Sequence, residues 1–219
     1  MTQWIQPKEF VSALITELES LPSRATAPMR TVRRRYSKEL RSEEAPYVFE
    51  VAQIILDSGK HRWIAYELIH DHPDAFHTLD RLKLEALGQG ISSWSSVDSF
   101  ARTLSGPAWR DGLISISTIQ EWAKSEDRWW RRAALVSTVG LNVRSRGGKG
   151  DVKQTLAICR MLVRDHDDMI VKALSWALRE LVVHDSRVVE EFIRCHRNEL
   201  AKLVIREVMN KIKTGFKNP

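Results

Sequence analysis

Apolar residues along the chain recur with the spacing of amphipathic α-helices. In FVSALITELESL (10–21), Phe10, Leu14 and Leu18 lie one turn apart and form an apolar stripe. The stretch MIVKALSWALRELVV (169–183) has the same period, and no segment alternates regularly enough to predict a strand. The pattern predicts an all-α protein.

Glycine and proline mark the expected ends of helices. YVFEVAQIILDSG finishes at Gly59, a residue type that favours a helix C-terminus, and RWIAYELIHDHP stops at Pro73. A chain of 219 residues is long enough for one elongated domain. We therefore expect a single domain over residues 1–219, with N-terminal helices in 1–55 and repeated helices in 56–213.

A repeat is visible when DRWWRRAALV (127–136) is aligned with DDMIVKALSW (167–176), 40 residues later. Amphipathic helices also align by chance, but here an aspartate, a cation and an alanine all coincide, which favours a true repeat. A period of this length, built on helix pairs, is typical of HEAT-like repeats. The expected fold class is thus an all-α, HEAT-like helical-repeat solenoid, an α-α superhelix with a concave basic groove.

The repeat also predicts which polar side chains share a surface. Arg132 and Lys172 occupy equivalent positions of successive repeat helices, and Trp176 follows Lys172 by one turn. Trp94 precedes Arg132 by nearly one repeat, and Asp98 follows Trp94 by one turn. These five residues are therefore expected on the same concave surface.

Composition and charge narrow the classes of partner. The formal net charge is +6 and the pI is about 9.5, which makes nucleic acid a natural partner, although many basic proteins bind none. No apolar run reaches the roughly 18 residues of a membrane helix, and MTQWIQPKEF at the start lacks the apolar core of a signal peptide. Cys159 and Cys195 have no metal-type or redox-type spacing and are expected to be small core residues in a reducing compartment. We therefore expect a cytoplasmic protein with no membrane partner.

Basic residues gather in segments that are candidate contacts to phosphate groups, for which guanidinium has a suitable geometry. The alternative is a set of solvated cations on the polar faces of ordinary helices. One cluster surrounds Trp129 and Trp130, and another, NVRSRGGKGD (142–151), contains glycines typical of a loop between helices. The candidate DNA contacts are Arg33, Arg34, Arg35, Arg128, Arg131, Arg144, Arg146, Lys149 and Lys172.

Other kinds of site find little support in the sequence. His70 and His72 have no third ligand at metal spacing and are expected to be surface histidines. The glycines of 142–151 lack the GxxxxGK[ST] spacing of a phosphate-binding loop, and the sequence has no dinucleotide fingerprint. We expect neither a metal site nor a cofactor.

Three stretches, SSWSSVDSF, DRWWRRAALV and VKALSWALRE, resemble the AlkD-like DNA glycosylases, bacterial alkylation-repair proteins built from HEAT-like repeats. The resemblance covers roughly residues 55–210 in order and spacing. It implies that the lesion site is lined by Trp94, Asp98, Arg132 and Trp176, four of the five residues that the repeat places on one surface.

The sequence departs from that family at identifiable positions. Ser93 stands where better-known members have a second tryptophan, and Ser95 stands where they often have an acid. The first 50 residues match poorly, so the resemblance transfers no lesion-facing aromatic there; Tyr36 is a candidate.

The resemblance implies hydrolysis of the N-glycosidic bond of cationic N3- or N7-alkylated purines, such as 3-methyladenine and 7-methylguanine, in double-stranded DNA. The carboxylate of Asp98 would stabilise the oxocarbenium-like sugar and position water. Trp94 and Trp176 would contact the damaged nucleotide, and Arg132 would hold the adjacent phosphate and keep Asp98 ionised. Because no lysine lies among these four residues, the enzyme is expected to be a monofunctional glycosylase without a Schiff base. The base need not be fully extruded.

Two alternatives stay open at this stage. One is a non-catalytic HEAT-repeat protein that recognises distorted or branched DNA, and the other is a protein-interaction scaffold. Asp98 favours catalysis, because pure DNA binding gains nothing from an acid facing phosphates. Nothing in the sequence indicates oligomerisation, so we expect a monomer that is associated with the nucleoid when bound to DNA.

Overall fold

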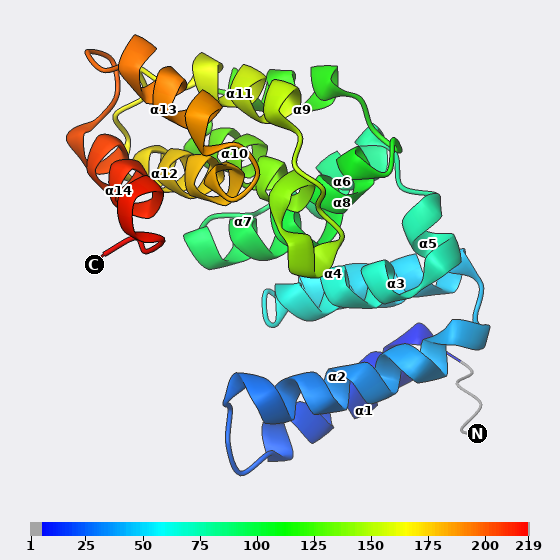
Figure 1. Ribbon diagram of the computed structural model, residues 1–219. Helices are drawn as coiled ribbons and strands as arrows, with labels where there is room; N and C mark the ends of the chain where they lie inside the picture. Colours follow the sequence, from blue (N-terminus) through cyan, green and yellow to red (C-terminus); the bar gives the residue numbers. More distant parts are fainter. Residues whose placement is uncertain (1–5, 219) are drawn as a thin grey trace. The chain divides into compact units, whose positions relative to one another are not determined.

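The computed structural model describes residues 6–218, and these are helices and connecting segments without a strand (Figure 1). The all-α prediction is thereby confirmed. Residues 1–5, part of the segment on which the signal-peptide argument rested, lie outside the described residues, as does residue 219. Among the described helices none is long and apolar enough to cross a membrane. The contacts divide the chain into two compact units, one ending at Leu87 and one beginning at Gly88.

The first unit is built on the apolar stripes seen in the sequence. Phe10 and Leu14 are fully buried in the core. The helix C-terminus predicted near Gly59 is confirmed, because Gly59 follows the last helical turn with a φ of 69°. Pro73 ends one helix and opens the next. The elements are α1 (Pro7–Ser20), α2 (Thr26–Glu39), η1 (Leu40–Ser42), α3 (Ala45–Asp57), α4 (Arg62–Asp71), α5 (Pro73–His77) and α6 (Arg81–Leu87).

Arg33, expected to contact DNA, is instead part of this unit's interior. Its side chain is only 7% exposed. The Nε atom lies 2.7 Å from Oε2 of Glu67, and Nη1 donates to Asp71 and to Ser37. A buried charge needs such partners, because desolvation is otherwise unfavourable. Arg33 therefore ties α2 to α4 and is not retained as a phosphate contact.

The structure contradicts three further predictions from the sequence, those for Tyr36, His72 and Cys195. Tyr36 is 5% exposed and donates to Glu17, so it does not face a lesion. His72 is not a surface residue: its Nδ1 accepts from the backbone N–H of Ala75 and caps α5, while Nε2 lies 3.0 Å from the carbonyl of Glu43. Cys159 is buried as expected, but Cys195 is exposed.

The second unit places its helices in two layers (Figure 1). Helices α9, α11 and α13 lie on one side, and on the other side α12 packs against both α10 and α14. The segment α7–η2–α8 packs against α10 and extends this second layer. The bounds are α7 (Trp94–Phe100), η2 (Ala101–Ser105), α8 (Gly106–Arg110), α9 (Ile116–Ala123), α10 (Arg128–Asn142), η3 (Arg144–Arg146), α11 (Val152–Met161), α12 (Asp168–Val182), α13 (Ser186–Cys195) and α14 (Lys202–Thr214).

The repeat seen in the sequence corresponds to equivalent helix starts. Asp127 is the N-cap of α10 and accepts from the backbone N–H of Trp129, and Asp167 caps α12 by accepting from that of Met169. Both helices have 15 residues. An N-cap aspartate satisfies an amide that has no partner within the helix. The aspartates 40 residues apart are therefore equivalent N-caps, of α10 and of α12.

Small residues let α8 approach α10 closely. A Cβ atom on Gly140 would lie 2.8 Å from the carbonyl carbon of Gly106, and one on Gly106 would lie 2.8 Å from the carbonyl oxygen of Ser137. The hydroxyls of Ser105 and Ser137 are 2.7 Å apart at the same crossing. This contact fixes the distance between α8 and α10, and α10 carries Arg132 of the site described next.

Candidate functional site

The centre of the candidate site is an ion pair between Asp98 on α7 and Arg132 on α10. Nε of Arg132 donates to Oδ1 of Asp98 at 2.9 Å, and Nη2 donates to Oδ2 at 3.0 Å. The side chains of Arg132 and Asp98 are 6% and 15% exposed. Two parallel N–H···O bonds fix both position and plane of the carboxylate. The structure thus brings together two of the residues that the sequence placed on one surface.

Arg132 is also tied to the next repeat. Its Nη1 donates to the carbonyl oxygen of Met169 on α12 at 2.6 Å. The guanidinium therefore reaches across α7, α10 and α12, with one edge on the carboxylate. This geometry does not fit the phosphate contact expected for Arg132. It fits the other role expected of it, which is to place a positive charge beside Asp98.

Burial is the strongest influence on the protonation of Asp98. Desolvation raises the pKa of Asp98 above its usual value, and the hydrogen bonds and charge of Arg132, with the charge of Arg102, offset only part of that rise. A carboxylate offers about four lone-pair sites, of which Arg132 takes two. Its side chain as a whole stays 15% exposed.

Trp94 is the first residue of α7 and lies one turn before Asp98. It is 60% exposed, an unusual state for so large an apolar side chain. Ser93 caps this helix: its hydroxyl accepts from the N–H of Ser96, and the Ser96 hydroxyl accepts from the N–H of Ser93. The serine found in place of the family's second tryptophan therefore has a local role in starting the helix that presents Trp94.

Trp176 on α12 is joined to the site by Arg102, a residue that the sequence analysis missed. The Arg102 guanidinium carbon lies 5.3 Å from the centroid of the Trp176 ring. The ring nitrogen of Trp176 donates to Glu180 at 2.9 Å. Arg102 follows Asp98 by four residues, and this spacing was the available signal.

Several predicted DNA contacts are engaged within the protein. Arg131 donates to Asp165 at 2.7 Å and to the carbonyls of Ser125 and Glu126, so it holds the α9–α10 connection. We do not retain Arg131 as a phosphate contact. Lys172 pairs along its own helix with Asp168, and the structure does not bring it to Asp98.

Arg128 is a more exposed member of the same cluster. It lies 3.3 Å from Asp167 and over the ring of Trp129 at 5.0 Å, with its side chain 52% exposed. Trp130, by contrast, packs at 4.9 Å from Trp122. The tryptophan pair thus divides between a surface stack and an aromatic cluster.

The glycine-containing segment 142–151 is an ordered turn beyond α10. Gly147 and Gly150 have φ values of 86° and 87°, a backbone region that favours glycine. Arg144 donates to the carbonyl of Val183, and Arg146 and Lys149 are exposed. These three cations, together with Arg34 and Arg35 of the first unit, remain candidates on the surface. Arg35 is paired with Glu17.

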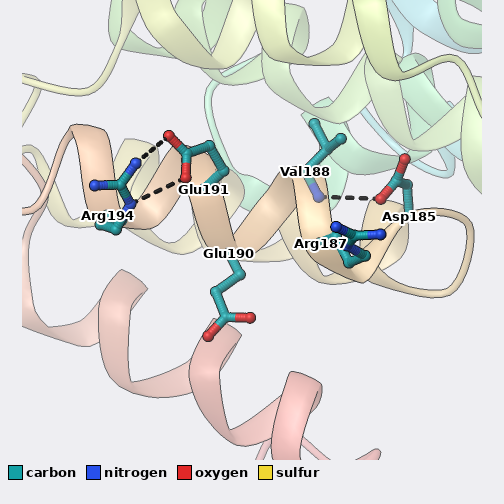
Figure 2. Close-up of a pocket in the computed structure, with 6 residues that line it drawn as sticks. All are labelled: Asp185, Arg187, Val188, Glu190, Glu191 and Arg194. Atoms are coloured by element: carbon teal, nitrogen blue, oxygen red, sulfur yellow. Dashed lines mark hydrogen bonds and ion pairs between the residues drawn. The ribbon is translucent and has the colours of Figure 1, made fainter.

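A hollow of about 610 Å³ lies along α13, and none of the candidate site residues lines it (Figure 2). Three of its charged groups have partners within α13 or at its start: Arg194 binds both oxygens of Glu191, and Asp185 accepts from the backbone N–H of Val188. Over residues 6–218 no group of three or more metal-ligand side chains is found.

Comparison with known proteins adds an independent finding. A family model described as DNA alkylation repair enzyme matches residues 23–212, which is most of the chain. No curated protein matches the sequence. The matched region includes every residue of the Asp98 site, and this chain belongs to the DNA alkylation repair enzyme family.

Proposed function

We propose that the protein is a monofunctional DNA glycosylase that removes cationic N3- and N7-alkylated purines, such as 3-methyladenine and 7-methylguanine, from double-stranded DNA. The observation that carries the proposal is the Asp98 carboxylate, held in a fixed plane by buried Arg132 one turn after exposed Trp94. We further propose that it acts as a cytoplasmic monomer on nucleoid DNA, in one concave groove and without a cofactor.

The main requirement that this reaction places on the protein is a fixed negative charge beside the sugar. Alkylation makes the base cationic, so the electron pair of the breaking N-glycosidic bond neutralises the departing base. Positive charge then develops on the sugar, and water adds to C1′ and loses a proton. Asp98 is the group that stabilises the sugar cation and orients the water, because Arg132 leaves part of its lone-pair capacity unused.

Arg132 acts in this proposal as a positioning residue. A carboxylate close to DNA phosphates would otherwise gain a proton and lose its charge, since neighbouring anions raise a carboxyl pKa. The paired guanidinium counteracts that effect and prevents rotation of the carboxylate. Trp94 and Trp176 supply apolar and π surface to the damaged nucleotide, and a cation over such a ring gains about 0.5–2 kcal/mol.

The decisive experiment is single-turnover release of 7-methylguanine and 3-methyladenine from a duplex, comparing the intact protein with Asp98→Asn. We expect the variant to bind DNA and release base at least about tenfold more slowly, which corresponds to roughly 1.4 kcal/mol of barrier. Asp165→Asn is a matched control, because it removes the charge of a partly buried carboxylate that is paired with Arg131, the neighbour of Arg132 on α10. It should leave the rate unchanged.

Two outcomes would reject the proposal. If the intact protein binds duplex DNA but releases neither base, the non-catalytic DNA-binding alternative takes its place. If both aspartate variants slow release equally, Asp98 is a structural ion-pair partner and not the catalytic carboxylate. A protein-interaction scaffold would bind no duplex at all, whereas counterion release should make genuine DNA affinity fall steeply with salt.

A further inference from the structure

The last helix, α14, carries a stripe of cationic side chains that the proposed mechanism does not use. Its exposed cations are Lys202, Arg206 and Lys213, and their spacing places them on one face of the helix. Within residues 6–218 none of these three forms an ion pair. The only acidic residue of α14 is Glu207, which is buried and paired with Lys217. The α14 stripe is therefore a positive surface without an exposed acid on its own helix.

This stripe lies in register with the candidate site. Counted from the N-cap of each helix, Asp98 of α7 and Arg132 of α10 are both the fifth residue. The fifth residues of α12 and α14 are Lys172 and Arg206. Because α10 packs against α7 and α12, and α12 packs against α14, these positions follow one another across the layer (Figure 1). The row begins with the carboxylate, continues with its paired arginine and ends in two exposed cations.

An exposed basic face can be no more than a solvated surface, but the arrangement of charge on α14 argues for a ligand. Exposed cations on neighbouring helices pair with an acid one turn away, as Lys172 does with Asp168 and Arg194 does with Glu191. On α14, Arg206 instead follows Lys202 by one turn, and like charges at this spacing repel each other. A polyanion along the stripe would remove that repulsion and release counterions.

We propose that the α14 stripe binds backbone phosphates of the DNA duplex at a distance from the damaged nucleotide. Packed helices lie about 8–10 Å apart, so α14 is roughly 16–20 Å from α10. Since each base pair adds about 3.4 Å to the duplex, this distance corresponds to about five or six nucleotides along a strand. The inference rests on the proposed function, because it takes the Asp98 site as the place where the lesion binds.

The test measures binding, not catalysis, on a duplex that carries a tetrahydrofuran abasic analogue. The phosphates of both strands are replaced one at a time by neutral methylphosphonates. The test variant combines Lys202→Gln, Arg206→Gln and Lys213→Gln. The matched control removes three exposed cations on α11, on α13 and directly after α13, by Lys153→Gln, Arg187→Gln and Arg197→Gln. Glutamine has a helix propensity similar to that of lysine and arginine, so both variants should fold, and circular dichroism checks this.

The test variant should bind the duplex at least about tenfold more weakly than the intact protein, and its slope of log affinity against log salt should fall by about two to three. Neutralising a phosphate about five or six nucleotides from the analogue should weaken binding by the intact protein and leave that of the test variant unchanged. Both proteins should respond equally to neutralisation of the phosphates next to the analogue. The control variant should behave like the intact protein, although it loses the same charge.

The inference is overturned if the test variant keeps the affinity and salt slope of the intact protein, or if the control variant is weakened as much. It is also overturned if the test variant loses its sensitivity only at the phosphates next to the analogue. If the triple variant does not fold, Arg206→Gln alone decides the question: the salt slope should fall by about one, and an unchanged slope rejects the contact. Failure of the intact protein to release base would reject the proposed activity without affecting this readout.

Discussion

Replacement of Arg132 by alanine is expected to destabilise the protein strongly, because it leaves Asp98 as a buried carboxylate without its cation. Removing one partner of a buried pair typically costs about 3–5 kcal/mol. Asp98 can escape by taking up a proton, and protonating an ordinary aspartate with a pKa near 3.9 at pH 7 costs roughly 4 kcal/mol. Both routes therefore predict a loss of about 4 kcal/mol in the free energy of unfolding. Loss of the hydrogen bond from Arg132 to the carbonyl of Met169 adds to this destabilisation.

A double-mutant cycle separates the pair from the packing of each side chain. Arg132→Ala, Asp98→Ala and the double variant are unfolded in urea, and the coupling energy is the difference between the double variant and the sum of the singles. We expect the double variant to be more stable than Arg132→Ala, since it no longer contains the isolated carboxylate. The coupling should be about 2–3 kcal/mol, within the range known for contacting residues.

The pH dependence of the unfolding free energy provides a second check on Arg132→Ala. In Arg132→Ala the folded-state pKa of Asp98 lies even further above its unfolded value, so the folded state binds the proton more tightly. Its deficit in unfolding free energy should therefore shrink as the pH is lowered from 7 towards about 4. A coupling below about 0.5 kcal/mol, or a deficit independent of pH, would refute the view that Arg132 neutralises a buried charge.

Three further outcomes are expected. Gly140→Ala should lower the unfolding free energy by about 1–3 kcal/mol, because its Cβ would meet the Gly106 backbone at 2.8 Å; an unchanged thermal midpoint would contradict the close crossing. Single-turnover base release should decline on acidification at a pH above the ordinary aspartate range, because burial raises the pKa of Asp98 and the ionised form is the active one; a rate that stays constant down to about pH 4 would contradict this. Arg33→Gln should lower the free energy of unfolding in urea by about 3–5 kcal/mol and leave DNA affinity unchanged, because Arg33 is buried. Arg34→Gln should leave stability unchanged and weaken DNA binding, because Arg34 is exposed. The reverse result would return Arg33 to the DNA contacts.

The sequence by itself determined the elements and the repeat. Apolar residues spaced by one helical turn are enough to identify a helix, because the spacing reflects a periodic backbone. The aspartates 40 residues apart could be aligned because N-capping is a local interaction between one side chain and an amide two residues later. Trp94 and Asp98 were likewise placed one turn apart by their spacing alone.

Only the tertiary structure decided what each charged side chain does. Arg131 and Arg132 are neighbours in one basic cluster, yet one holds a loop through Asp165 and the other fixes Asp98. Arg33 and Arg34 divide in the same way between the interior and the surface. Partners more than 30 residues away in sequence make these assignments, and an arginine's charge is the same whether it meets carboxylate, ring or solvent. The stacking of Arg102 on Trp176 likewise depends on how two helices pack, so no local pattern could predict it.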